Sequence, residues 1–239
     1  MAMNKEECQR MNEAAAANKV NLQIGFMRRF DSNFRRAKEL IEAGAIGQVV
    51  TVKSLTHGPS IPQEWMYDIA KSNGPLAEVN SHDIDTLRWF TGSEAESLYA
   101  IAGNFRCDSA KLKYPDFYDT VLMNVRMKSG MLGNIDGAQG VQYGYDARVD
   151  IVGTDGHIAI GGLAESTTLL YCKDKQFHGD TVKSWTALFH EAYVNEDISF
   201  IRSIREGKLP EVSGLDGMAA AEIVNAGNES IRTGQIIYL

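Results

Sequence analysis

Three titratable side chains and a tryptophan between residues 72 and 89 have a spacing that could place them together, and the titratable ones could support acid–base chemistry. These residues are Glu78, His82, Asp85 and Trp89. In a helix they would stand at i, i+4, i+7 and i+11 and would therefore share one face, as a stripe along the helix. A carboxylate one turn before a histidine can hold the imidazole in one tautomer, and the imidazole can then take or relay a proton. The same pairing is also common on protein surfaces, where the histidine has no chemical role.

The residues around this stripe indicate how it would be positioned. The turn Asn73-Gly74-Pro75 precedes it, and Thr91-Gly92 follows it. Between them, Ile84, Leu87 and Phe90 supply apolar side chains for burial. This pattern predicts one helix from about Leu76 to Phe90 that opens beside a glycine turn.

The residue pattern of the rest of the chain predicts helices near both ends and strands in the middle. Short turn signals at 128–130 and 154–156 suit hairpins, and consecutive strands with short turns indicate an antiparallel meander. We therefore expect an α+β fold in which a large, mostly antiparallel open sheet carries helices on one face. The expected helices are 5–18, 33–43 (capped by Asp31 or Ser32), 194–205 (starting as early as Ser184) and 215–232, and the expected strands are 20–26, 48–56, 97–105, 119–127, 130–138, 147–153, 156–161, 167–172 and 235–239.

Composition excludes several classes of function. The chain has 239 residues and a net charge of −7, which argues against an electrostatic nucleic-acid surface. No apolar run approaches a membrane span, and the start M-A-M-N-K-E-E-C has no signal-peptide core. Cys8, Cys107 and Cys172 are widely spaced and odd in number, which favours a reduced, cytoplasmic protein. We expect neither a nucleic-acid nor a membrane partner.

A metal site is the other chemistry that the stripe could support. Glu78, His82 and Asp85 offer oxygen and nitrogen ligands, but sites built on one helix commonly contain two histidines. The remaining histidines have no partner at a suitable spacing. We therefore expect no metal.

Three segments together resemble one protein family. Residues 73–85, N-G-P-L-A-E-V-N-S-H-D-I-D, resemble the G-G-x-x-x-D-x-x-x-H-x-x-D signature in the substrate domain of the Gfo/Idh/MocA family. Residues 25–31, G-F-M-R-R-F-D, and residues 38–47, K-E-L-I-E-A-G-A-I-G, resemble two further family segments. Members are NAD(P)-dependent sugar and polyol dehydrogenases, with inositol 2-dehydrogenases among the nearest. The resemblance runs over essentially the whole chain.

The resemblance implies hydride transfer between nicotinamide and a sugar or polyol hydroxyl, with His82 and Glu78 as catalytic residues. Glu78 stands where the family has aspartate, and Val79 follows where inositol dehydrogenases have threonine. Thr56 and Gly58 occupy places where inositol dehydrogenases have histidine and asparagine, with His57 between them. Several polyol contacts of the inositol dehydrogenases are therefore replaced in this chain.

Six further residues are candidates for the binding of substrate or cofactor. Arg28 matches an arginine of the family segment and could reach cofactor or substrate, or form a surface salt bridge. His57 lies at the end of an expected strand. Trp65 could stack on a sugar or act as a packing plug. Tyr143, Tyr145 and Tyr193 align more loosely with substrate-side tyrosines of the family, and each could simply pack in the sheet or on a helix.

The resemblance also implies a domain organisation. Residues 1–26 correspond to the end of a dinucleotide-binding domain, and residues 27–239 to a substrate-binding and oligomerisation domain. No strand leads into a G-x-G-x-x-G turn. The family's Glu-Lys-Pro motif, with its catalytic lysine, would lie before Met1, and Lys5 does not match it.

These expectations leave two functions open. One is the C-terminal domain of an oxidoreductase that acts on a small sugar or polyol, with NAD or NADP bound by the full-length parent and no cofactor by this chain, which would be inactive alone. The other is a non-catalytic binding or assembly domain that retains the fold. In either case the family implies a homodimer or homotetramer formed through the sheet face.

Overall fold

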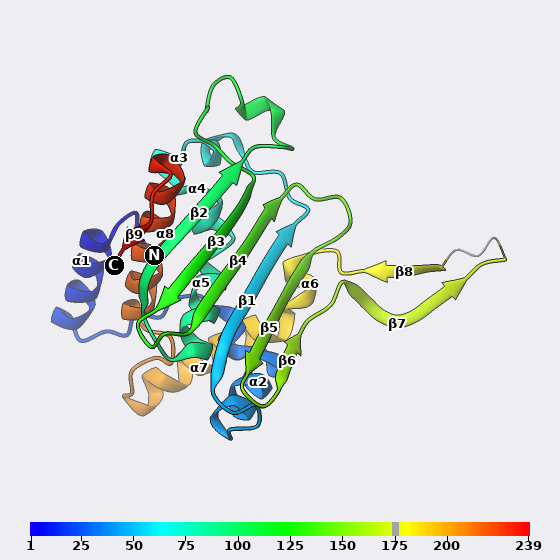
Figure 1. Cartoon of the computed structure of the whole chain (residues 1–239). Helices are drawn as coiled ribbons and strands as arrows, with labels where there is room; N and C mark the ends of the chain where they lie inside the picture. Colours follow the sequence, from blue (N-terminus) through cyan, green and yellow to red (C-terminus); the bar gives the residue numbers. More distant parts are fainter. Residues whose placement is uncertain (174–176) are drawn as a thin grey trace.

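A seven-stranded sheet forms the centre of the computed structural model, which describes residues 1–173 and 177–239 (Figure 1). Its strand order is β6-β5-β1-β4-β3-β2-β9. The strands are β1 (Val49–Gly58), β2 (Ala95–Gly103), β3 (Thr120–Met127), β4 (Leu132–Gln139), β5 (Asp146–Gly153), β6 (His157–Ile160) and β9 (Ile237–Tyr238). The prediction of a mostly antiparallel sheet is confirmed.

The predicted meander is wrong in one respect, which is the place of β1. This strand comes first in the chain but lies between β4 and β5, parallel to β4 and antiparallel to β5. Short turns link β3 to β4 and β5 to β6, as hairpins require. A turn signal fixes only the pairing of consecutive strands, so it carries no information about where a distant strand inserts.

Helices cover one face of this sheet, and none of the helices in the described ranges lies on the other face (Figure 1). Alternation along β3 shows the two environments: Val121, Met123 and Val125 are buried toward the helices, whereas Leu122 and Asn124 between them are exposed. The helices are α1 (Lys5–Ala17), α2 (Ser32–Glu42), α3 (Ile69–Ser72), α4 (Gly74–Glu78), α5 (Ser81–Thr91), α6 (Trp185–Leu188), α7 (His190–Glu206) and α8 (Gly214–Thr233), with short 3₁₀ turns η1 (Met27–Phe30), η2 (Glu64–Tyr67) and η3 (Asp108–Ala110).

The predicted helix over 76–90 is two helices, α4 and α5, with a break at Val79 and Asn80. Asn80 is fully buried, and its side-chain amide donates to Asp83 rather than facing solvent. Such local side-chain bonding competes with the helical backbone. Gly137 of β4 leaves the space that Asn80 fills, since a Cβ there would come within 2.1 Å of the Asn80 amide oxygen.

Residues 20–26 do not form the predicted strand. Their only ladder contact among the residues described is a single bridge between Gln23 and Ser213, supported by a hydrogen bond from Ile24 N to Val212 O. The alternating pattern therefore gives an extended segment without a neighbouring strand. This segment and α1 pack on α8, where Gly214 admits the side chains of Asn12 and Leu22.

A two-stranded arm, β7 (Ala164–Tyr171) paired with β8 (Phe177–Thr181), projects from one side of the sheet (Figure 1). The predicted strand over 167–172 falls within or beside β7, whereas β8 was not predicted because its polar, glycine-containing sequence has no apolar alternation. Nowhere in the described ranges is a helix both long and apolar enough to cross a membrane.

Candidate active site

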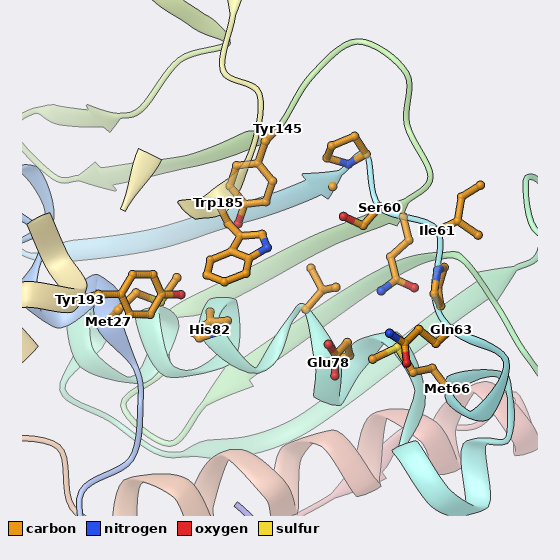
Figure 2. A pocket seen from close by; sticks show the side chains of 15 residues that line it. Met27, Ser60, Ile61, Gln63, Met66, Glu78, His82, Tyr145, Trp185 and Tyr193 are labelled. Carbon is orange, nitrogen blue, oxygen red and sulfur yellow. The ribbon is translucent and has the colours of Figure 1, made fainter. Parts of the chain in front are cut away.

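A cavity of about 500 Å³ opens on the helical side of the sheet (Figure 2). Its walls come from segments that are distant in sequence: the loop after β1 (58–63) with Met66, the α4–α5 junction, the end of β4, and single aromatic residues before β5, on α6 and on α7. Its lining combines apolar side chains with a smaller number of polar ones, as is usual for small-molecule sites. Four of the residues predicted for the site line it: Glu78, His82, Tyr145 and Tyr193.

His82 lies in the first turn of α5 and packs edge-on against Phe26 at 5.9 Å between ring centroids. Burial lowers the pKa of its imidazole to about 4, with a further lowering by the charge of Arg28 and an opposing effect of Asp83. The ring is therefore neutral at pH 7. Its Nδ1 is buried without a hydrogen-bond partner among the described residues.

Glu78 does not orient His82 as the spacing had predicted. None of the described hydrogen bonds joins the two side chains, and Figure 2 shows them entering the cavity at separate positions. The helix break between them changes the angular relation that i and i+4 would have on one continuous helix. The rest of the predicted stripe also turns away, because Asp85 is buried in an ion pair with Arg29 at 2.5 Å and Trp89 packs near the same guanidinium.

Arg28 lies in the protein interior, not in a surface salt bridge, and only 1% of it is exposed. Its guanidinium donates to Asp83 at 2.8 Å, to Ser54 at 3.2 Å and to Thr56 at 2.5 Å. It does not line the cavity. It influences the cavity through its charge, which opposes the raised pKa that burial gives Tyr145.

Asp83 is the centre of this buried network. Its carboxylate also accepts from Ser54 Oγ at 2.5 Å, Thr56 Oγ1 at 2.8 Å and Asn80 Nδ2 at 2.9 Å. These bonds fix the start of α5, and with it His82, against β1. Sequence reasoning missed Asp83; the available signal was a pair of small hydroxyl residues at alternating, inward positions of a β-branched run.

His57 lies on the opposite face of the sheet, which corrects its assignment to the substrate site. Its Nε2 contacts Asp136 Oδ1 at 2.9 Å and its Nδ1 contacts the Tyr143 hydroxyl, so the Tyr143 candidate lies there too. The neighbouring Thr56 points toward the helices and is buried. Side chains alternate along a strand, so one position decides the face.

Trp65 does not line the cavity either. It is half exposed, and its indole Nε1 donates to Gln63 Oε1 at 3.1 Å. The cavity tryptophan is Trp185 at the start of α6, which packs edge-on against Tyr193 at 5.7 Å (Figure 2). Trp185 and Gln139 are cavity residues that sequence reasoning missed. Ser184, the N-cap of α6, marked the local helix start but gave no sign that the next residue reaches the site.

A dinucleotide's pyrophosphate is typically bound where a strand leads into a glycine-rich start of a helix. In the described part of the chain, the strand that leads directly into a helix is β8, which enters α6 through Val182, Lys183 and Ser184, without a glycine-rich turn. Within the same residues, no three His, Cys, Asp or Glu side chains gather as metal ligands. Of the side chains that line the cavity, His82 and Glu78 are the candidates for proton transfer.

Comparison with known proteins identifies the family to which the chain is similar. Residues 34–159 match the GFO/IDH/MocA C-terminal domain. The chain is 32% identical to the myo-inositol 2-dehydrogenase of Thermotoga maritima over 100% of its own length and 70% of that protein's. It is 31% identical to the scyllo-inositol 2-dehydrogenase (NAD(+)) of Bacillus subtilis, covering 100% of this chain and 68% of that protein.

Solved structures agree in fold. A probable dehydrogenase from Thermotoga maritima superposes with a TM-score of 0.91 at 29% identity, covering 99% of this chain and 70% of that one. A Lactobacillus casei scyllo-inositol dehydrogenase with bound NAD(H) and scyllo-inositol superposes with a TM-score of 0.87 at 23% identity, covering 99% and 70%, and shares the fold. With a domain match over more than half of its length and a relative 32% identical along all of it, the chain belongs to the GFO/IDH/MocA oxidoreductase family.

Proposed function

We propose that this chain is the polyol-binding part of an NAD(P)-dependent dehydrogenase that transfers hydride between nicotinamide and a ring hydroxyl. The observation that carries the proposal is the cavity, which brings His82, Glu78, Tyr145 and Tyr193 together from four segments. Relatives named as inositol dehydrogenases along the whole chain support the substrate class.

The cavity suits a small polyhydroxylated ring. Its volume of about 500 Å³ lies in the range of small-molecule sites. Trp185, Met27 and Val79 offer apolar surface for ring C–H groups, whereas carboxylate, phenol and amide groups offer hydrogen bonds to hydroxyls.

His82 is the proposed acceptor of the substrate hydroxyl hydrogen bond. A neutral imidazole can accept such a bond at pH 7, and its pKa of about 4 makes it a relay rather than a group that stores the proton. The Asp83 network would hold the ring while substrate binds. A further group must take the proton away, and we infer that it lies outside this chain, as does the dinucleotide site.

A fusion protein tests the proposal. The portion of the Thermotoga maritima relative outside the match is joined ahead of this chain, and NAD reduction is followed with a panel of inositols. We expect activity in the fusion, and a decrease of about two to four orders of magnitude in kcat with His82→Ala at smaller change in KM. A folded His82→Ala fusion with unchanged kcat would contradict the catalytic assignment.

The chain alone is expected to bind neither NAD nor NADP. Calorimetric titration at millimolar dinucleotide measures this, and micromolar affinity would show that the domain assignment is wrong. The rival function, a non-catalytic binding or assembly domain, predicts polyol binding by the chain but no turnover in a correctly folded fusion. Glu78, in place of the family's aspartate, is the sequence feature that favours the rival.

A further inference from the structure

The side-chain amide of Gln139, the last residue of β4, forms no hydrogen bond with any residue that the structure describes. The residue is 93% buried and lines the cavity. Its amide oxygen is inaccessible and unpartnered, and no described residue bonds its amide nitrogen. A buried amide without partners costs free energy and is rare in folded proteins. An amide in this state at a cavity wall is suited to a ligand.

The backbone of Gln139 and of the two residues after it is hydrogen-bonded, so its side chain starts from a defined point at the cavity wall. Gln139 N donates to Asp119 O at 2.8 Å, and the next two residues donate to the loop after β1, Gly140 to Ser60 and Val141 to Gly58, each at 3.2 Å. Hydrogen bonds on both flanks keep the end of β4 and the cavity loop together. A polar group held in this way can select among ligands without first paying for its own ordering.

Glu78 lies at the same end of the cavity. Both residues also line a small adjoining hollow with Pro62 and Met66. The Glu78 carboxylate only accepts hydrogen bonds, whereas the Gln139 amide offers donors as well as an acceptor. A single hydroxyl can donate to the carboxylate and accept from the amide, so the pair matches one hydroxyl of a polyol.

We propose that Gln139 is a specificity-determining residue whose side-chain amide, beside Glu78, binds a substrate hydroxyl other than the one that reacts at His82. This inference rests on the proposed function. It assigns Glu78 to the recognition of substrate rather than to the orientation of His82, in keeping with the absence of a bond between those two side chains among the residues described.

The test is calorimetric binding of myo-inositol and its monodeoxy analogues to the 239-residue chain. Gln139→Met keeps the length of the side chain and removes the amide, and Gln139→Ala is a second variant if the first folds poorly. Gln142→Met is the matched control, an exposed glutamine three residues on that does not line the cavity. Circular dichroism establishes that each variant is folded.

We expect Gln139→Met to bind myo-inositol about tenfold more weakly, while Gln142→Met binds as the wild type does. One deoxy analogue should bind wild type and Gln139→Met equally, because it lacks the hydroxyl that the amide contacts. A folded Gln139 variant that binds myo-inositol as tightly as wild type, or that weakens every analogue alike, would overturn the inference. If the wild-type chain bound neither myo-inositol nor scyllo-inositol, the proposed function would fail first, and this inference with it.

Discussion

His82 and Asp83 are adjacent residues that differ in how their buried polar atoms are hydrogen-bonded. Asp83 keeps four donors around its carboxylate, whereas His82 has lost water at Nδ1 and gained no partner in the described structure. The folded protein therefore disfavours imidazolium. Because the buried imidazole resists protonation, the stability of the folded protein depends on pH.

The pKa of His82 is about 4 in the folded protein and 6.5 in its ordinary state, so between these values the unfolded chain binds more protons. Its contribution to the free energy of unfolding is present above pH 6.5 and is lost as pH falls toward 4, by about 3 kcal/mol in total. His82→Asn should flatten this part of a denaturation profile measured from pH 7 to pH 4. An unchanged slope would show that the imidazole is solvated.

The titration of Glu196 on α7 should change the stability of the protein with pH in the opposite direction. Burial, with a smaller effect of Asp197, raises its pKa from 4.5 to about 7, and its Oε1 has no partner among the residues described. The folded protein therefore binds more protons between these values, and the stability that Glu196 contributes at low pH is lost as pH rises toward 7. Glu196→Gln should raise the melting temperature at pH 8 and change it little at pH 4. Glu191→Gln, which removes an exposed carboxylate from the same helix, serves as the control.

The Arg28–Asp83 pair should be costly to break from one side. Arg28→Met leaves the Asp83 carboxylate buried without its charged partner, and we expect the free energy of unfolding to fall by about 3–5 kcal/mol. Arg35→Met removes an exposed pair with Glu211 and should cost about 1 kcal/mol or less. Urea denaturation compares the two. Equal losses would mean that the buried pair is not an organising contact.

At the scale of elements, the sequence predicted where most helices and strands lie, but not which side of the sheet each strand residue faces. The capping residues Asn4, Asp31 and Ser213 begin α1, α2 and α8 as their types indicate, and β-branched runs became strands. Which side a strand turns toward the helices depends on distant packing, and this reversed the roles of Thr56 and His57. The Asn80 break had no local signal, because it depends on Gly137, which lies in a strand far along the chain.

That contact between Gly137 and Asn80 gives an element-scale prediction. In Gly137→Ala the new methyl would lie 2.1 Å from the Asn80 amide oxygen, so α5 must move or Asn80 must release Asp83. We expect destabilisation of about 1–3 kcal/mol and weaker polyol binding. Gly162→Ala, where a Cβ meets nothing within 4 Å, should change neither. Equal denaturation midpoints for the two variants would contradict this account of the break.

At the scale of the whole molecule, the uncovered sheet face is the expected surface of association. Tyr99, Ile101 and Leu122 are 40–52% exposed on this face, and Ile101 pairs with Leu122 across β2 and β3. We predict a homodimer, or a tetramer of dimers, through this surface. Leu122→Glu should shift sedimentation at micromolar concentration toward a 26.4 kDa species, whereas Leu209→Glu, exposed on the link between α7 and α8, should not. Wild-type protein that sediments only as the monomer would refute the prediction.

The central place of β1 has a consequence for how the chain folds as it is made. Thr51 pairs with Leu132 on one side and Val152 on the other, so β1 is synthesised long before either partner leaves the ribosome. Its inward residues can be shielded early only by nearby helices, and closing the long loop to β4 carries an entropic cost that precedes any gain. The nascent chain therefore carries β1 without a partner strand while the roughly 75 residues between Gly58 and Leu132 are made, which takes about 4–15 s at about 5–20 residues per second. The strand that holds Ser54 and Thr56 in place for the site is also the segment most exposed to premature association with other chains.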